Sequence, residues 1–204
     1  MLKFENIQKS FGEKQVLRGV FLHVKKGEII SLAGMSGCGK TTLLRIAAGL
    51  ENADDGRVFV NGKIAFSFAE ARLFPSVNVL ENITCVMDMK DKNEKKKRAL
   101  AYLSKMGLSG AETLLPEELS TGMAARVSLA RAMAYDAELY LLDEPFKSLD
   151  GEVKKTVMDA LKIFLKDKAC LFISHDPSES DYFATKKYEM KDGILVEIPS
   201  FMQI

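Results

Sequence analysis

Residues 34–42, GMSGCGKTT, constrain the fold of this chain more than any other segment. They match the pattern G-x-x-x-x-G-K-[ST], and they lie between the apolar run IISLA and an amphipathic helical pattern. Glycines in such a loop let backbone N–H groups turn towards phosphate oxygens. The order of strand, glycine-rich loop and helix therefore predicts a phosphate-binding loop in an α/β domain.

Individual residues of this loop have separate expected roles. The loop would offer its backbone N–H groups at Ser36, Gly37, Cys38 and Gly39. Lys40 would reach the β- and γ-phosphates of a nucleotide, and the Thr41 hydroxyl would bind Mg²⁺. Thr42 can add a bond to an inner phosphate. The segment therefore predicts a nucleoside triphosphate as ligand.

The cysteines are odd in number and show no paired spacing: Cys38, Cys85 and Cys170. A reduced, cytosolic setting fits this pattern best. Cys38 has two interpretations, either a nucleophile or redox switch, or a residue that fills a variable position of the loop. The sequence offers no evident histidine or second cysteine as its partner, which favours the second interpretation.

A second chemical motif is LYLLDEP, in which Asp143 and Glu144 follow a buried strand. Ligands of open α/β sheets bind at the carboxyl ends of the strands, where this acidic pair would lie. Asp143 suits Mg²⁺, through a water molecule. Glu144 suits either a general base for the attacking water or a residue that orients this water. Together with residues 34–42, the pair predicts nucleotide hydrolysis.

Apolar runs alternate with helical patterns along most of the chain. Strands are expected over LKFENIQKSF, VLRGVFLHV, IISLAG, GRVFVNGKIAFSF, ELYLLDE and ACLFIS, a hairpin at Asp192-Gly193, and helices near residues 41–50, 79–134 and 152–166, with Pro116 as a break. This order predicts an α/β fold with a mainly parallel sheet and N-terminal antiparallel strands. Residues 1–204 would form one domain, with a helical subdomain (about 69–125) inserted into a core lobe (about 1–68 and 126–204).

The bulk composition limits the function classes. Hydrophobic residues make up 47% and charged residues 28% of the chain, and the formal net charge is +1. This balance is typical of a globular domain and gives no general reason to expect a nucleic-acid partner. The apolar runs are shorter than the roughly 20 residues that span a bilayer. The N-terminus lacks the apolar core of a signal peptide.

One charge run, KDKNEKKKRALAYLSKMGL, has two interpretations. It could be a patch that binds RNA or lipid, or the solvated face of an amphipathic helix that buries Leu100, Leu103 and Met106. Acidic residues interrupt the run, which favours the solvated face.

The segment ELSTGM precedes another helical pattern, AARVSLARAMA. Its hydroxyls and glycine stand where the free N–H groups and the positive end of a helix can hold an anion. Ser120 would contribute its hydroxyl and Gly122 its N–H. The alternative is a simple N-cap, for which serine and threonine are favoured in any protein.

These motifs occur in one order: GMSGCGKTT, LSTGM, LLDEP, SLD and SHD. In this the chain resembles the ATP-binding subunit of ATP-binding-cassette (ABC) transporters, from Phe11 to about Val196. The segment EARLFPSVNVLENI is most similar to subunits that drive uptake of nitrate, sulfonate or taurine. The resemblance implies a P-loop NTPase fold, with ATP and Mg²⁺ as ligands. It further implies an ATPase on the cytoplasmic face of the membrane, peripheral to membrane-spanning permease subunits, with an extracytoplasmic solute-binding protein as a further partner.

The resemblance also assigns roles to single residues. Phe11 matches an aromatic residue that stacks on adenine, and Val16 lies beside the ribose. His175, in SHD, matches a histidine that contacts the γ-phosphate. Ser120 and Gly122 match the signature that completes the ATP site of a second copy, in a head-to-tail ATP-sandwich dimer. Asp150, in SLD, matches the loop that communicates between the two copies.

Two positions depart from the family pattern. Ala69 stands where the family has a glutamine that touches Mg²⁺ or the lytic water. Glu70 is one residue further on, but in an extended segment it would point the other way. Thr121 stands where a glycine is usual. These departures affect coupling to the membrane partner more than nucleotide binding, and we expect hydrolysis to survive, at a reduced rate.

Three functions therefore compete: an ATPase that powers a membrane transporter, a soluble ABC-type ATPase without a membrane partner, and a module that binds ATP without turnover. The first is the leading hypothesis. The membrane partner would dock on the helical subdomain around residues 74–81. Leu73 and Phe74 would be either exposed apolar anchors of that surface or part of the core of the subdomain.

Overall fold

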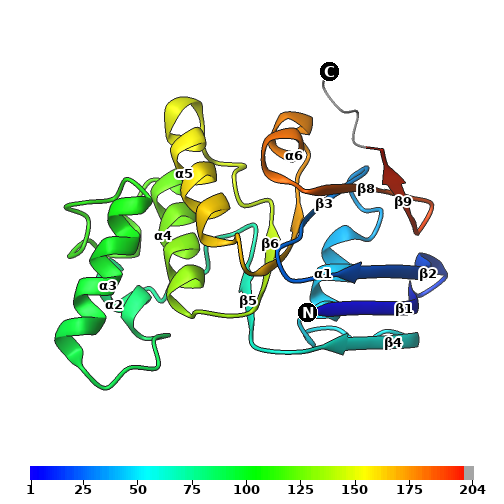
Figure 1. Cartoon of the computed structure of the whole chain (residues 1–204), viewed down its shortest axis with the longest axis horizontal. Helices are drawn as coiled ribbons and strands as arrows, with labels where there is room; N and C mark the ends of the chain where they lie inside the picture. Colours follow the sequence, from blue (N-terminus) through cyan, green and yellow to red (C-terminus); the bar gives the residue numbers. More distant parts are fainter. Residues whose placement is uncertain (200–204) are drawn as a thin grey trace.

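The computed structural model describes residues 1–199, whose strands form two sheets (Figure 1). In chain order the elements are β1 (Leu2–Phe11), β2 (Lys14–Val24), β3 (Ile29–Ala33), α1 (Lys40–Ala47), β4 (Asp55–Val60), β5 (Ile64–Ser67), α2 (Val79–Thr84), α3 (Lys92–Lys105), a 3-10 turn η1 (Pro116–Glu118), α4 (Thr121–Ala134), β6 (Leu139–Asp143), α5 (Gly151–Phe164), β7 (Ala169–Ile173), α6 (Pro177–Phe183), β8 (Lys186–Lys191) and β9 (Ile194–Ile198). Within the described residues, no helix combines the length and the apolar character needed to cross a bilayer.

The larger sheet has six strands in the order β5-β6-β7-β3-β8-β9, and its neighbours are parallel except for the hairpin β8–β9. The smaller sheet has the order β2-β1-β4 and is antiparallel. This confirms the predicted α/β fold with N-terminal antiparallel strands. The hairpin turns at Asp192 and Gly193, as predicted, and both have the positive φ values (48° and 80°) that a type I′ turn requires.

The strands β3, β6 and β7 of the larger sheet are buried on both faces, and alternate residues of each strand supply the two faces. In β6, Tyr140 and Leu142 pack into the core under the helices α2 to α5, together with Phe172 of β7. Leu139 and Leu141 point the other way and pack with α1 and the small sheet. Helix α1 therefore lies between the two sheets, and its first turn faces the carboxyl ends of the parallel strands.

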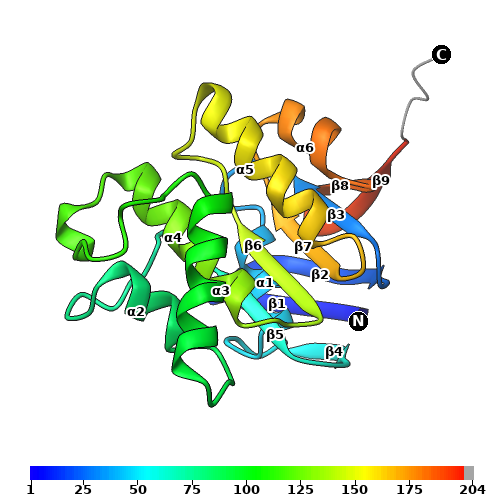
Figure 2. The same ribbon diagram turned by 60° about the vertical axis from the view of Figure 1, so that its left-hand side comes forward.

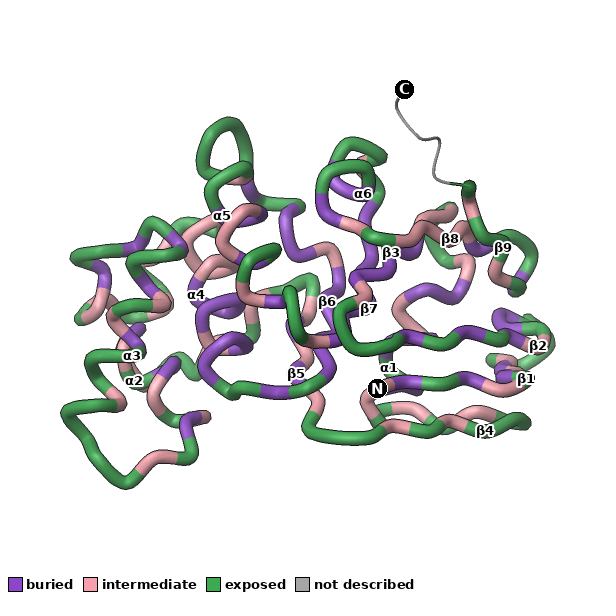
Figure 3. Tube along the Cα trace, viewed as in Figure 1, coloured by how far each residue is buried: buried purple, intermediate pink, exposed green. Residues whose placement is uncertain are grey.

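Helices α2, α3 and α4 gather at one end of the molecule (Figure 2), far from the small sheet (Figure 1). The charge run lies on the exposed side of α3 (Figure 3), and the helix buries Ala99 and Leu103, with Met106 buried at its C-cap. Leu100 is only half-buried. Helix α4 extends from this end into the core under the sheet, so the helices and the sheet share one continuous core.

Three helix expectations differ from the structure. Within residues 79–134 the chain is also non-helical at residues 85–91, between α2 and α3, so Pro116 is not the only break. The helix predicted over residues 41–50 ends at Ala47, because Gly49 takes a φ of 69° and turns the chain out of the helix. Helix α6 was not predicted. Its signal is the pair Asp176-Pro177: the Asp176 side chain accepts a hydrogen bond from the Ser178 N–H, and proline occupies the first helical position.

Candidate nucleotide site

A cavity of about 310 Å³ lies beside the phosphate loop, at the carboxyl ends of the parallel strands. Its walls are formed by Phe11, Lys14, Val16, Ser36, Gly37, Gly39, Lys40, Thr41, Thr42, Glu144, Ile173 and His175. A hollow of about 760 Å³ on the β1–β2–β4 sheet is larger, but its lining holds none of the predicted site residues. An adjoining cavity of about 560 Å³ holds only Val16, Gly37 and Cys38 of them. The cavity beside the phosphate loop holds most of them and is therefore the candidate site.

Two residues of the cavity were not predicted, Lys14 and Ile173. Lys14 pairs with Phe11 across the short β1–β2 turn. Ile173 ends β7 directly before the SHD motif. Neither side chain type marks a nucleotide site by itself.

The glycines of the phosphate loop are required by close backbone contacts. A Cβ atom on Gly39, which has a φ of 110°, would lie 2.8 Å from the carbonyl oxygen of Val16. A Cβ atom on Gly34 would lie 2.7 Å from the carbonyl oxygen of Met190. The loop is thus pressed between β2 and β8, and its course is set by backbone packing.

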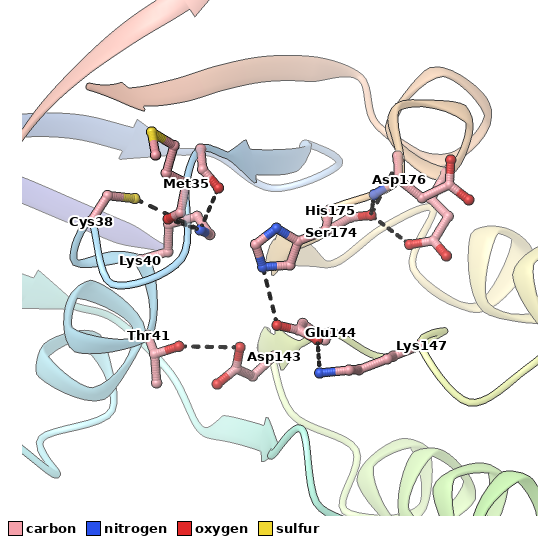
Figure 4. Close-up of polar contacts among 12 residues, drawn as sticks. Met35, Cys38, Lys40, Thr41, Asp143, Glu144, Lys147, Ser174, His175 and Asp176 are labelled. Atoms are coloured by element: carbon pink, nitrogen blue, oxygen red, sulfur yellow. Dashed lines mark hydrogen bonds and ion pairs between the residues drawn. The ribbon is translucent and has the colours of Figure 1, made fainter.

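Lys40 is the first residue of α1 and is only 5% exposed. Its ammonium group donates hydrogen bonds to the carbonyl oxygens of Gly34 (2.7 Å) and Met35 (2.9 Å) (Figure 4). The following N–H groups, at Thr41 and Thr42, belong to the first turn of α1, whose donors have no partner within the helix. A buried cation and free helix N–H groups together form an anion site.

Cys38 lines a neighbouring cavity rather than the nucleotide cavity. Its N–H donates to the Met35 carbonyl oxygen at 3.4 Å, and its sulfur lies 3.7 Å from the Lys40 ammonium. These contacts are internal to the loop. They favour the interpretation of Cys38 as a residue that fills the loop.

Asp143 ends β6 and is 6% exposed. Burial raises the pKa of its carboxyl group above the ordinary value, and the hydrogen bond from the Thr41 hydroxyl (3.4 Å) opposes this rise. A desolvated carboxylate beside a hydroxyl is a donor set that suits a hard cation such as Mg²⁺. The side chains of Thr41 and Asp143 thus fit the predicted metal-binding roles.

Glu144 turns the chain sharply after β6, with a φ of 49° that non-glycine residues rarely adopt. One carboxylate oxygen lies 3.2 Å from His175 Nε2, and the other lies 2.8 Å from Lys147 Nζ (Figure 4). The N–H of Glu144 donates to the Ile173 carbonyl oxygen at 3.2 Å. The strained turn therefore places a base candidate at the edge of the cavity, in contact with the predicted histidine.

The loop that carries His175 is fixed by a buried polar network that sequence reasoning missed. The Ser174 hydroxyl donates to Glu179 Oε2 at 2.5 Å, and Lys154 forms an ion pair with the same carboxylate. Bonds from the Ser178 hydroxyl and from Lys154 lower the pKa of Asp176 to about 2. Only the Asp-Pro helix start gave a signal for this network in the sequence.

Ser120, Gly122 and Asp150 do not line the cavity of their own chain. Ser120 caps α4, and its hydroxyl accepts the Met123 N–H at 3.2 Å, so the N-cap interpretation holds within one chain. A Cβ atom on Gly122 would lie 2.8 Å from the Ser148 carbonyl oxygen. The start of α4 thus packs against the loop that leads to Asp150, which caps α5 without a side-chain hydrogen bond.

The segment after β5 lies outside the cavity as well. Ala69 and Glu70 are exposed, and neither lines the cavity. Phe74 is 54% exposed, whereas Leu73 packs against the core. The two residues predicted as docking anchors therefore differ in burial. Phe74 is a surface residue, and Leu73 belongs mainly to the core.

Arg131 and Asn82 hold the loop that displays Phe74. Arg131 donates to the carbonyl oxygens of Ala71 (3.1 Å) and Arg72 (3.0 Å), and its guanidinium lies 5.5 Å from the Phe74 ring centroid. The fully buried Asn82 accepts the Phe74 N–H at 2.8 Å. These contacts keep an exposed aromatic side chain in a fixed place.

A phosphate loop, an acidic pair after a central strand and a histidine after the next strand define a P-loop nucleoside triphosphatase. The family model described as "ABC transporter" matches residues 17–147. The chain therefore belongs to the ABC transporter family, as the subunit that binds and hydrolyses ATP to power transport. This confirms the resemblance found in the sequence.

Relatives and solved structures agree with this assignment. The aliphatic sulfonates import ATP-binding protein SsuB of Corynebacterium glutamicum is 39% identical, over 95% of this chain and 83% of that protein. The probable sulfate/thiosulfate import ATP-binding protein CysA of Chlorella vulgaris is 37% identical, over 98% of this chain and 91% of that protein. A dimeric ATP-binding cassette in a post-hydrolysis state, bound to ADP and Pi, matches with a TM-score of 0.89 and 28% identity, over 98% of this chain and 100% of that chain.

Proposed function

We propose that the protein is the Mg²⁺-dependent ATPase of an importer of small oxyanions, acting at the cytoplasmic face of the membrane. The observation that carries the enzymatic part is the convergence of Lys40, Glu144 and His175 on one cavity, with Asp143 bonded to Thr41 beside it. The cargo class is supported by the similar import proteins for sulfonates and for sulfate or thiosulfate. The partners would be permease subunits and an extracytoplasmic solute-binding protein.

In the proposed mechanism Phe11 and Val16 receive the base and ribose, while Lys40 and the loop N–H groups hold the phosphates. Thr41 and Asp143 would hold Mg²⁺, which would neutralise developing charge on the phosphates. Glu144 accepts a proton from the attacking water, and His175 orients Glu144 and contacts the γ-phosphate. The positioned charges favour the transition state without rearrangement at the moment of reaction.

The position of the signature supports a second copy of the chain as partner. Ser120 and Gly122 lie outside the cavity of their own chain, so their anion-binding helix end is available to another. In a head-to-tail pair this end would face the γ-phosphate held by Lys40 of the other copy. Asp150 would lie near the same contact.

The helical subdomain, about residues 69–125, would carry the permease docking surface. Its strongest candidate is Phe74, which is exposed and held in place by Arg131 and Asn82. A fixed aromatic side chain loses little conformational entropy on binding, which suits an interface anchor.

Paired sites predict that the ATPase activity of the purified protein rises with its own concentration. The measurement is turnover per subunit over a range of protein concentrations, with and without Ser120→Ala. The variant should bind ATP normally as a single chain but lose most of the concentration-dependent rise, because its helix end lacks the hydroxyl. Turnover per subunit that is constant with concentration and equal in both proteins would contradict the dimer. ATP binding without turnover would favour the alternative binding module, for which Ala69 is the reason.

The proposed metal site predicts that EDTA stops turnover and leaves ATP binding measurable, because the phosphates keep Lys40 and the loop N–H groups. Asp143→Asn should raise the Mg²⁺ concentration needed for half-maximal activity, since an amide binds the cation less strongly than a carboxylate. A titration of activity and of Mg²⁺-dependent ATP affinity tests this. Asp159→Asn on α5 is the matched control, and equal Mg²⁺ requirements in both variants would contradict the assignment.

A further inference from the structure

Lys9 is a nearly buried cation next to the base end of the site. It is 9% exposed and lies on β1, two residues before Phe11. Its ammonium group is 5.2 Å from the centroid of the Phe11 ring, within the range of a cation–π contact. Phe11 itself is half exposed and lines the nucleotide cavity. One side of the ring is therefore engaged by a charge of the protein.

Two carboxylates hold this ammonium group. Glu51 lies 2.8 Å and Asp54 3.1 Å from Lys9 Nζ. Asp54 also accepts the Ser10 N–H at 2.6 Å, and its own N–H donates to the Gln8 carbonyl oxygen at 2.9 Å. The end of β1 is thus bonded, through side chain and backbone, to residues 51–54.

Residues 51–54 follow α1, and α1 begins at Lys40 of the phosphate loop. The contacts of Lys9 therefore connect the element that carries Phe11 with the element that carries the phosphate site. The distance between base and phosphates in a nucleotide is fixed by its covalent structure. A protein that binds both ends gains affinity when its two subsites are held at that distance.

We infer that Lys9 is a positioning residue for nucleotide recognition, which holds the Phe11 ring for stacking against a purine base and ties it to the segment that follows α1. This inference rests on the proposed role of Phe11. It concerns the nucleoside end of the ligand only. The inferred role of Lys9 should therefore affect the affinity for ATP and leave the affinity for the phosphate chain alone unchanged.

The test compares affinities for ATP and for inorganic tripolyphosphate in EDTA, where no turnover occurs. Phe11→Ala should weaken ATP binding by roughly 5- to 150-fold, the range found for stacked bases. Lys9→Met should weaken it by about two- to fivefold, the range of a cation–π contact to a ring that stays half exposed to solvent. Neither should change tripolyphosphate affinity. Lys9→Arg should retain ATP affinity, because guanidinium also packs over aromatic rings.

Two further variants sharpen the test. Glu51→Gln with Asp54→Asn alters only partly exposed carboxylates and should reproduce the selective loss of ATP affinity. Lys3→Met, on the same strand but paired with Glu5 at 2.5 Å, is the matched control and should change nothing. In the double variant Lys9→Met/Phe11→Ala, the effect of Lys9→Met should vanish, since its target is gone.

The outcomes separate the inference from the function on which it rests. Unchanged ATP affinity in Phe11→Ala would remove the base-stacking role and the inference with it. A loss in Phe11→Ala, with no loss in Lys9→Met or in Glu51→Gln/Asp54→Asn, would overturn the inference alone. Equal losses for ATP and tripolyphosphate in the Lys9 and carboxylate variants would also overturn it, because the effect would then be on the whole site.

Discussion

Glu144→Gln should reduce ATP turnover by about 10²- to 10⁴-fold, the usual contribution of a general base. The amide has nearly the same shape as the carboxylate and can still bond to His175 and Lys147, so the site should keep its geometry. It cannot accept a proton from water. ATP binding should therefore remain, and the variant should accumulate as an ATP-bound dimer.

Single-turnover kinetics measure the expected loss of turnover. Size-exclusion chromatography with ATP measures the expected ATP-bound dimer. Glu152→Gln, an exposed acidic residue at the start of α5, is the matched control and should retain full activity. If Glu144→Gln kept more than a tenth of the turnover, another group would have to be the base. A loss of ATP binding in the same variant would mean that Glu144 holds the site together instead.

Lys40→Met should weaken ATP binding by about 10- to 150-fold, because hydrogen bonds to a charged group contribute roughly 1.5–3 kcal/mol. The methionine side chain is of similar length and leaves little empty space, but it cannot bond to phosphate oxygens. In the protein without nucleotide, the Lys40 ammonium is bonded to two loop carbonyls, so the variant also leaves these acceptors without their partner. The loss should appear for ATP and tripolyphosphate alike.

Equilibrium titration with both ligands in EDTA tests this expectation. Lys147→Met is the matched control, because Lys147 contacts Glu144 but does not line the cavity. Wild-type tripolyphosphate affinity in Lys40→Met would contradict the phosphate role of Lys40. Lys9→Met is expected to lower the affinity for ATP alone, whereas Lys40→Met should lower the affinities for ATP and for tripolyphosphate. The ratio of the two affinities should therefore differ between the two lysine variants.

Much of the fold followed from the sequence because its signals are local. The apolar strands, the glycine-rich loop and the Asp192-Gly193 turn each depend on neighbouring residues. The same holds for Lys40, Thr41 and Glu144, whose motif fixes both residue type and element. The cavity accordingly contains most of the residues predicted for it.

The remaining features depend on contacts between distant segments. Lys9 reaches Glu51 and Asp54 only because β1 and the segment between α1 and β4 meet in the fold. The network of Ser174, Glu179 and Lys154 likewise joins separate elements. No local pattern marks such pairs. The sequence also did not predict that Leu73 is partly buried and Phe74 exposed. Adjacent residues of an irregular loop have no periodic pattern that assigns them to core or surface.

The close approach of Gly122 to the Ser148 carbonyl oxygen has a consequence for the proposed dimer. Ser148 lies between Glu144 and Asp150, in the loop that serves the site of its own chain, whereas Gly122 would serve the site of the other copy. We expect a displacement of either segment to displace the other, because Gly122 has no side chain and leaves little space between the two backbones. In the proposed dimer, this close packing would couple the two ATP sites, and hydrolysis at one site would change the affinity for nucleotide at the other.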